Sequence, residues 1–469
     1  MIVEKPPLDR PLEELLGLAR AGRLSAAAIA QDGNDRQRRH GQALGAYVHR
    51  DETAIAAQAR AADAAFAVGA DCGPLQGMPV SLKDLYGLEG WPIYAGSPRR
   101  LPPEFERDGD IAGALRRQLA VFTGKTHTVE FAFGGLGTNP HWPVPRNPWD
   151  AVEHRVPGGS SAGAGISLHV DAVLALGTDT AGSARIPASM TGTVGMKTSY
   201  GRWPMSGIVP LAPSLDSAGL LARSAADARC AFHIVDAALA DGQPPAALED
   251  MPMSGLRLAV CDEVFWDDCS PGVAEAVTRA LDELVAAGAR LIRIDFPELG
   301  PMLELFHAGH LTATELDEFL NSALPQWLPT LDPRVAMRIG DAGALPAREY
   351  LGRKRRLARL AATTALRLER IDALVMPTVP ITPPALAALE DIDEYRRLNT
   401  LALRNTCCAN LLGLCAASLP VGLDAAAMPV GMQIVARGGT DATLMAIAAA
   451  CERVLGEPVE RIGRPPMLR

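Results

Sequence analysis

The hydrophobic and polar positions of this chain follow two periods, one typical of helices and one typical of buried strands. Leucines recur with helical spacing within residues 11–30, and residues 52–69 form an alanine-rich stretch that ends at a glycine. Both stretches predict helices. Short, uninterrupted apolar runs at 172–176 and 373–378 instead predict buried strands. The mixture of the two patterns indicates an α/β chain.

The second half of the chain continues this mixture. Residues 255–295 read as strand, helix and strand, which is a β-α-β pattern, and residues 439–454 predict a last helix. Residues 300–370 are mostly helical in pattern, with breaks at four prolines: Pro325, Pro329, Pro333 and Pro346. Because no internal repeat or low-complexity tail interrupts the chain, we expect one domain over residues 1–469.

Composition excludes several classes of partner. The 469 residues carry a net charge of −9, and the charges are interspersed, which argues against nucleic acid and against an anionic membrane surface. The chain begins without a signal-peptide pattern and has no apolar run near the roughly 18 residues of a membrane span. Its eight cysteines form no C-x-x-C pair, and most have apolar neighbours, as reduced core cysteines do. We therefore expect a cytoplasmic protein.

The candidate chemistry lies in residues 156–187, where two serine clusters are set in glycine-rich backbone. Residues 158–163 read GGSSAG, and residues 177–185 read GTDTAGSAR. Glycine permits tight turns and close approaches that a side chain would block. Each cluster is therefore predicted to be a tight loop that presents a serine hydroxyl and several N–H groups to one cleft. Such groups are suited to acyl transfer.

A third element lies upstream, where residues 77–84 read GMPVSLKD. Together the three segments resemble the signature of the amidase signature family of serine hydrolases, which uses a Ser–Ser–Lys triad. The resemblance implies that Lys83 is the base, Ser160 the bridging serine and Ser183 the nucleophile. It covers residues 70–235 closely and 370–455 more loosely, whereas residues 300–370 are the variable region in which we expect substrate selectivity.

The resemblance also implies the fold and the supporting residues. The expected fold is a single large α/β domain with a central mixed sheet covered by helices on both faces, and the Gly159–Ser160 peptide bond is expected to be cis. The oxyanion hole is assigned to the N–H groups of four residues: Thr180, Ala181, Gly182 and Ser183. Supporting roles are assigned to Ser161, Asp179 and Arg185, and substrate contacts to Ala132, Phe133, Gly134 and Gly135.

A lysine base places a physical condition on the site. An amide is a poor electrophile, so the serine that attacks it needs a base that is free to take its proton. A free lysine has a pKa of about 10.4 and is almost wholly charged at neutral pH. Burial or a nearby positive charge must therefore lower the pKa of Lys83.

Two residues depart from the family pattern inside the signature loops. Ala162 and Ala181 occupy positions where glycine is usual. Alanine resists a positive φ, so either loop is expected to be strained if its position requires one. Both substitutions keep the backbone N–H groups.

The sequence thus predicts an amidase that hydrolyses a small amide, arylamide or carbamate, without a cofactor or a metal. The resemblance also allows a homodimer, which is frequent in the family. A different interpretation within the family is the glutaminase-type subunit of an amidotransferase complex. That subunit commonly has glutamine after the signature arginine, whereas this chain has Ile186.

Two further alternatives come from other classes. Residues 159–163 match the G-x-S-x-G elbow of an α/β-hydrolase esterase with Ser161 as nucleophile. That fold needs a late histidine, and none follows His310. A metalloenzyme using His307 and His310 is the other alternative, but no established metal-ligand spacing surrounds them.

Overall fold

Eleven strands form one mixed sheet within the described residues of the computed structural model, which are 5–240, 250–309, 311–340 and 342–469. The sheet order is β1-β3-β2-β4-β6-β5-β10-β11-β9-β7-β8. The strands are β1 (Tyr47–His49), β2 (Pro79–Lys83), β3 (Val121–Thr126), β4 (Leu174–Asp179), β5 (Val194–Lys197), β6 (Ser217–Ala222), β7 (Arg257–Val260), β8 (Arg290–Arg293), β9 (Ala373–Pro377), β10 (Cys415–Leu423) and β11 (Pro429–Ala436).

The middle of the sheet brings the three signature segments together. Strand β2 runs parallel to β3 and β4, and Leu82 of β2 pairs with Leu176 of β4. Both β2 and β4 are buried along their whole length, which explains their continuous apolar runs. This register places Lys83, the last residue of β2, beside the segment that follows Leu176.

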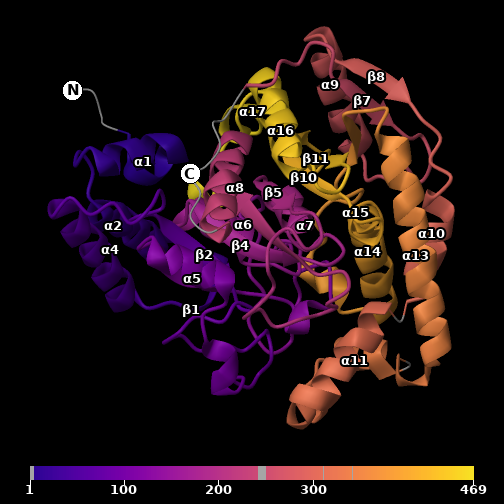
Figure 1. Cartoon of the computed structure of the whole chain (residues 1–469), viewed down its shortest axis with the longest axis horizontal. Coiled ribbons are helices and arrows are strands. Elements are labelled where there is room, and N and C mark those ends of the chain that lie inside the picture. The colour runs from indigo at the N-terminus through magenta and orange to yellow at the C-terminus, as the bar shows by residue number, and fades with distance from the viewer. Residues whose placement is uncertain (1–4, 241–249, 310, 341) are drawn as a thin grey trace.

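Helices pack against both faces of the sheet, as predicted (Figure 1). The helices before residue 299 and after residue 436 are α1 (Leu12–Arg20), α2 (Ala26–Arg36), α3 (Gln42–Leu44), α4 (Glu52–Ala67), α5 (Asp110–Arg117), α6 (Ala164–Val170), α7 (Arg185–Thr191), α8 (Ala225–Leu239), α9 (Val273–Ala286), α16 (Asp441–Leu455) and α17 (Pro458–Arg461). The expected helix over 11–30 is two helices, because Gly22 has φ 66° and the Ser25 side chain caps the start of α2.

The 300–370 region is helical and broken at its prolines, as predicted. Its helices are α10 (Leu299–His307), α11 (Leu311–Ala323), α12 (Pro333–Gly340) and α13 (Ala347–Leu368), with a 3₁₀ segment at Pro325–Thr330. They are followed by α14 (Ile392–Arg404) and α15 (Cys407–Leu411). Figure 1 shows α10 and α13 side by side along the edge of the molecule opposite the N-terminal helices.

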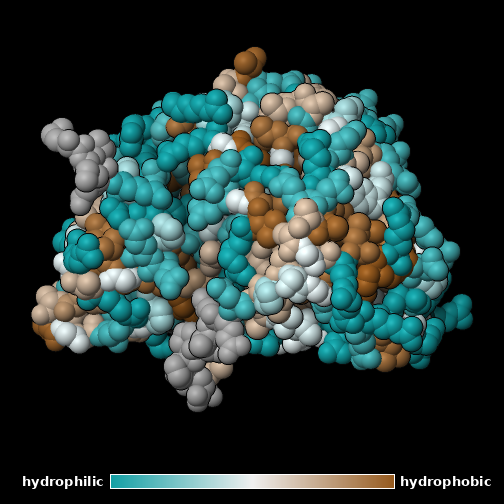
Figure 2. All heavy atoms as spheres, turned by 90° about the horizontal axis from the view of Figure 1, so that it is seen from above, coloured by the Kyte–Doolittle hydropathy of each residue, from teal (hydrophilic) through white to brown (hydrophobic). Residues whose placement is uncertain are grey.

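The face shown in Figure 2 is mostly hydrophilic, and its most extended hydrophobic patch lies right of centre. No helix of the described residues combines the length and the apolar character needed to cross a bilayer. All eight cysteines are free thiols.

Candidate active site

The loop between β4 and α7 carries the predicted nucleophile, Ser183, and is held in shape by Asp179 at the end of β4. The Asp179 carboxylate accepts hydrogen bonds from the N–H groups of Gly182, at 2.8 Å, and Ala184, at 3.1 Å. Arg185, the first residue of α7, donates to the same carboxylate through Nε at 3.0 Å and Nη2 at 2.9 Å. The predicted Asp179–Arg185 pair is confirmed.

This pair is fully buried and balances its own charge. Burial raises the pKa of Asp179, but the Arg185 guanidinium beside it outweighs that effect and holds the pKa below its ordinary value. Asp179 is therefore ionised, and its charge compensates Arg185. Asp179 forms no ion pair with Lys83, which is also buried.

Three N–H groups of the loop are left without a protein acceptor in the described part of the chain. Among the residues that the structure describes, the N–H groups of Thr180, Ala181 and Ser183 donate to no protein acceptor, and all three residues line one cavity. The prediction that Gly182 also contributes its N–H needs correction, because that N–H is taken by Asp179. The loop thus offers three donors instead of four.

Lys83 lies behind this loop at the end of β2 and is completely buried. Its Nζ donates to Ser160 Oγ at 2.7 Å and to Thr178 Oγ1 at 2.8 Å. Burial lowers the pKa of Lys83 to about 7, although Asp179 and Asp216 act to raise it. A substantial fraction of this amine is neutral at physiological pH, which is the condition that a lysine base must meet.

The loop that carries Ser160 is joined to its surroundings by backbone hydrogen bonds. The Gly159–Ser160 peptide bond is cis, as the family resemblance implied. The Gly159 N–H donates to the Gly135 carbonyl at 2.8 Å. Within the described part of the chain, the hydroxyls of Ser160 and Ser183 are not hydrogen-bonded to each other. Of the two hydrogen bonds that the triad requires among these described residues, the one between Lys83 and Ser160 is present and the one between Ser160 and Ser183 is not.

Ser161 plays a different part from the one that the esterase alternative requires. Its N–H donates to the Ser183 carbonyl at 3.2 Å, and its Oγ makes a long hydrogen bond of 3.5 Å to the Thr178 carbonyl. The side chain is fully buried and does not line the cavity. Ser161 joins the two serine loops, and the esterase alternative is wrong.

A cavity of about 330 Å³ lies in front of Ser183. Of the four predicted substrate contacts, Ala132, Phe133 and Gly134 line it, whereas Gly135 does not. The Gly135 N–H instead donates to Asn399 Oδ1 at 2.8 Å. Gly135 thus positions this loop, hereafter the acyl loop (residues 130–135), against the Ser160 loop and α14.

Backbone strain lies in the acyl loop and not in the two signature alanines. Neither Ala162 nor Ala181 has a positive φ, so alanine is tolerated at both sites. Phe131 and Ala132 have φ of 46° and 60°, in the left-handed region that glycine favours. Two consecutive residues of this kind next to a cavity are typical of a functional loop.

The rest of the cavity wall comes mainly from the 300–370 region and from α14. Sequence reasoning named one of its residues, His307, and only as a metal ligand. Most residues of this part of the wall are contributed by the helices α10, α11, α12 and α14, and they include His307, Met337, Arg338, Tyr395 and Asn399. Thr178 was also missed, although it lies within the quoted GTDTAGSAR motif. The arginine spacing on α12 is a signal that could have drawn attention to that helix.

The metal alternative depended on two histidines. His307 lines the cavity, and His310 lies outside the described residues. Among the described residues, no three side chains of His, Cys, Asp or Glu are grouped so that they could hold a metal ion.

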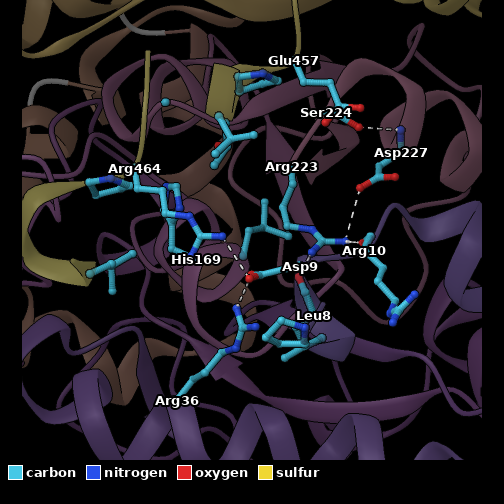
Figure 3. Close-up of a pocket in the computed structure, with 18 of the residues that line it drawn as sticks. Leu8, Asp9, Arg10, Arg36, His169, Arg223, Ser224, Asp227, Glu457 and Arg464 are labelled. Carbon is cyan, nitrogen blue, oxygen red and sulfur yellow. Dashed lines mark hydrogen bonds and ion pairs between the residues drawn. The ribbon is translucent and has the colours of Figure 1, made fainter. Parts of the chain in front are cut away.

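A second cavity, of about 350 Å³, lies between the N-terminal and C-terminal segments (Figure 3). We call it the terminal cavity. Asp9 accepts from Arg36 Nη1 at 3.0 Å and from Arg464 Nη2 at 2.9 Å, so it joins the two ends of the chain. Arg223 pairs with Asp227 at 3.5 Å. None of the predicted site residues lines this cavity.

Comparison with known proteins points to one family. The family model described as Amidase matches residues 31–445. A solved structure described as a crystal structure of amidase superimposes with a TM-score of 0.84 and 30% identity, covering 95% of this chain and 100% of that chain.

Two curated relatives match over almost their full length. A Comamonas testosteroni protein named 2-amino-5-chloromuconic acid deaminase is 44% identical over 457 residues, which is 97% of this chain and 98% of that protein. A Streptomyces coelicolor protein, named as one of the subunits of Glutamyl-tRNA(Gln) amidotransferase, is 30% identical over 499 residues, with 96% of each chain covered.

Proposed function

The chain belongs to the amidase family and is a hydrolase of carbon–nitrogen bonds other than peptide bonds, and we propose that it works through an acyl-enzyme on Ser183. The Ser183 Oγ attacks the carbonyl carbon of a small amide. The carbon–nitrogen bond then breaks, the amine leaves with one added proton, and the acyl group stays on Ser183 as an ester. Water hydrolyses that ester to release the acid and restore the serine.

Lys83 and Ser160 carry the proton in this proposal. The neutral Lys83 amine accepts the Ser160 proton while Ser160 takes the proton of Ser183. The same path in reverse delivers a proton to the leaving nitrogen. Thr178 Oγ1 accepts an N–H of Lys83, which turns the amine lone pair toward Ser160. The hydrogen bond between Ser160 and Ser183 forms when the substrate is bound, because catalytic hydrogen bonds are often long or absent in free enzymes.

The negative charge on the substrate oxygen is stabilised by the loop N–H groups in this proposal. Thr180, Ala181 and Ser183, whose N–H groups have no acceptor among the described residues, line the cavity. Removal of one such donor typically lowers turnover about 10²- to 10³-fold in other serine hydrolases. Asp179 and Arg185 hold these donors in place.

One observation carries the proposal. A buried lysine with a pKa lowered to about 7 donates to the hydroxyl of Ser160 at 2.7 Å and to that of Thr178, five residues before Ser183, at 2.8 Å. Burying a cation without a carboxylate is unfavourable for stability. A proton-transfer role explains why the chain keeps a lysine there.

The test is labelling by a fluorophosphonate followed by intact-mass analysis and peptide mapping. We expect one adduct, on Ser183, because an activated serine reacts with this reagent. An adduct on another serine, or no adduct on a folded protein, would contradict the assignment. Lys83→Ala should slow the labelling of Ser183, and Ser224→Ala in the terminal cavity is the matched control that should not.

A second candidate is favoured by the 44% identical relative, whose name describes the deamination of an amino-substituted acid. Loss of an amino group with addition of water also breaks a carbon–nitrogen bond and releases ammonia. Ammonia release from 2-aminomuconic acids, measured beside release from simple amides, separates the two candidates.

Three finer points stay predictions. Action within an amidotransferase complex is less favoured, because the Streptomyces coelicolor amidotransferase subunit is 30% identical over 96% of this chain whereas the deaminase is 44% identical over 97%. Co-purification of a small partner chain would favour it. Homodimer formation and a cytoplasmic location rest on the sequence alone, and light scattering tests the first.

A further inference from the structure

Arg338 is a half-buried arginine in the wall of the cavity that contains Ser183. It lies on α12, and its Nη1 donates to the Phe133 carbonyl at 2.7 Å. The guanidinium also stacks over the Phe133 ring, 3.7 Å from the ring centroid. Arg338 is therefore attached to the acyl loop, two residues from the strained Phe131.

Arg338 is not paired with any carboxylate in the part of the chain that the structure describes. Among the described residues, no carboxylate forms an ion pair with it, and no aspartate or glutamate lines the cavity. The other arginine in the wall, Arg396, is exposed and pairs with Asp393 at 3.3 Å. Arg338 thus gives the cavity wall a positive charge that no carboxylate of residues 5–240, 250–309, 311–340 and 342–469 compensates.

This arrangement is costly unless something supplies the missing anion. Burial lowers the pKa of Arg338, which Tyr395 partly opposes, but an arginine stays charged in proteins. A guanidinium has five N–H donors, and Arg338 uses one of them on a protein acceptor. The remaining donors form a fork that matches the two oxygens of a carboxylate.

We propose that Arg338 binds a carboxylate of the substrate, and that this amidase acts on small amides that carry a second, free carboxylate group. This inference rests on the proposed function, because it concerns the same cavity. Arg338 contacts Phe133, and Ala132, Phe133 and Gly134 line the cavity beside Ser183. The carboxylate therefore belongs to the acyl part of the substrate, which makes the substrate a monoamide of a dicarboxylic acid.

The position of Arg338 is fixed from a second side. The N–H of Asp332, immediately before α12, donates to Glu130 Oε2 of the acyl loop at 2.6 Å. Asp332 and Arg338 thus join the acyl loop to α12 at the two ends of this helix. A rigid support of this kind is what a specificity residue needs, because a carboxylate held by Arg338 then sets the distance of the amide from Ser183.

The size of the cavity limits the substrate. A volume of about 330 Å³ lies at the lower end of the range for small-molecule sites. Monoamides of four- to six-carbon dicarboxylic acids are therefore the appropriate probes. Hydrolysis releases the dicarboxylate and ammonia or an amine.

The experiment compares substrates that differ in charge but hardly in shape. Succinamate and glutaramate carry the carboxylate, and succinamide and glutaramide are their neutral equivalents. We expect kcat/KM to favour the charged member of each pair by about 10- to 100-fold. In Arg338→Gln this preference should disappear, chiefly through a higher KM for the charged substrate, and Arg338→Lys should recover part of it.

Arg334→Gln is the matched control, because it removes an arginine one turn earlier on the same helix. Arg334 stacks over Tyr395 and donates to the Leu389 carbonyl at 2.6 Å, and it does not line the cavity. Its variant should keep the charge preference. Equal turnover of charged and neutral substrates by the natural enzyme, or an equal loss of preference in both variants, would overturn the proposal.

A second readout separates this inference from the proposed function. Glutarate should slow fluorophosphonate labelling of Ser183, glutaramide should not, and Arg338→Gln should abolish the protection. If Ser183 is labelled at the same rate with and without glutarate, the proposed function stands and the carboxylate site is wrong. If Ser183 is not labelled at all, the proposed function itself fails. Protection by glutarate tests the carboxylate site even if neither succinamate nor glutaramate is hydrolysed.

Discussion

Two cavities of nearly equal size lie in different parts of this amidase, and their charges are balanced in different ways. In the terminal cavity, of about 350 Å³, Asp9 accepts from both Arg36 and Arg464. In the cavity of about 330 Å³ beside Ser183, Arg338 donates to a backbone carbonyl and is paired with no carboxylate of the described residues. Volume therefore does not distinguish the two sites, whereas charge compensation does.

The difference has a physical basis. A charge that finds its partner within the protein contributes to the fold and leaves little free energy for a ligand. A charge without a partner is costly in the free protein, and a ligand that neutralises it recovers that cost. Lys83 follows the same logic, since the nearby Asp179 is already paired with Arg185 and the amine reaches neutrality by losing its proton.

The largest expected contrast compares a serine from each cavity. Ser183→Ala should lower kcat on the order of 10⁴-fold or more, because no other group takes over the nucleophile's role. Ser224 in the terminal cavity caps α8 by accepting from the Asp227 N–H at 3.0 Å. Ser224→Ala should lower the free energy of unfolding by about 1 kcal/mol and leave kcat unchanged. Steady-state rates and denaturant unfolding of both variants test the contrast. A Ser183→Ala enzyme that keeps its activity would remove the basis for assigning the cavities different roles.

The second contrast concerns pH. Lys83 must be neutral to accept a proton, and its pKa is lowered to about 7 by burial. Because the protonated amine is inactive, kcat/KM should rise with pH through about 7 and level off above it. Lys83→Ala should lose about 10³-fold in rate and the rise near pH 7 with it. Measured profiles between pH 5.5 and 9.5 provide the check, and a rise centred near pH 10, or one unchanged in the variant, would refute the role of Lys83.

The smallest effect is expected in the terminal cavity. Asp9→Asn removes the charge shared by Arg36 and Arg464, which should cost about 1 kcal/mol of stability without changing kcat/KM. Burial raises the pKa of Asp9, but hydrogen bonds from Arg464 and Arg36 outweigh it and lower the pKa overall.

The sign of the pH effect follows from that shift. A carboxylate with a lowered pKa stabilises the fold above its ordinary pKa and loses this effect as pH falls. The difference in thermal unfolding between the natural protein and Asp9→Asn should therefore narrow below about pH 4. A variant that loses activity at neutral pH would show that the terminal cavity has more than a structural role.

Much of the site could be predicted because its parts are local in the chain. Asp179, Gly182 and Arg185 interact across a strand end, a loop and the first turn of a helix, within seven consecutive residues. The glycine-rich loops, the buried strands and the Lys83–Ser160 pairing all follow from short segments whose pattern resembles one family. The sequence also indicated that Lys83 must be neutral.

Tertiary structure alone decided the rest. Burial sets how far the pKa of Lys83 falls, and no single segment determines burial. The bond from Arg338 to Phe133 joins residues that are 205 positions apart, and periodicity within α12 does not reveal which distant loop the helix meets. Whether a carboxylate lies close enough to pair with Arg338 depends on every element that packs around the cavity. Local chemistry was therefore determined by the sequence itself, whereas the presence of Arg338 in the same cavity as Ser183 came only from the way that distant segments pack together.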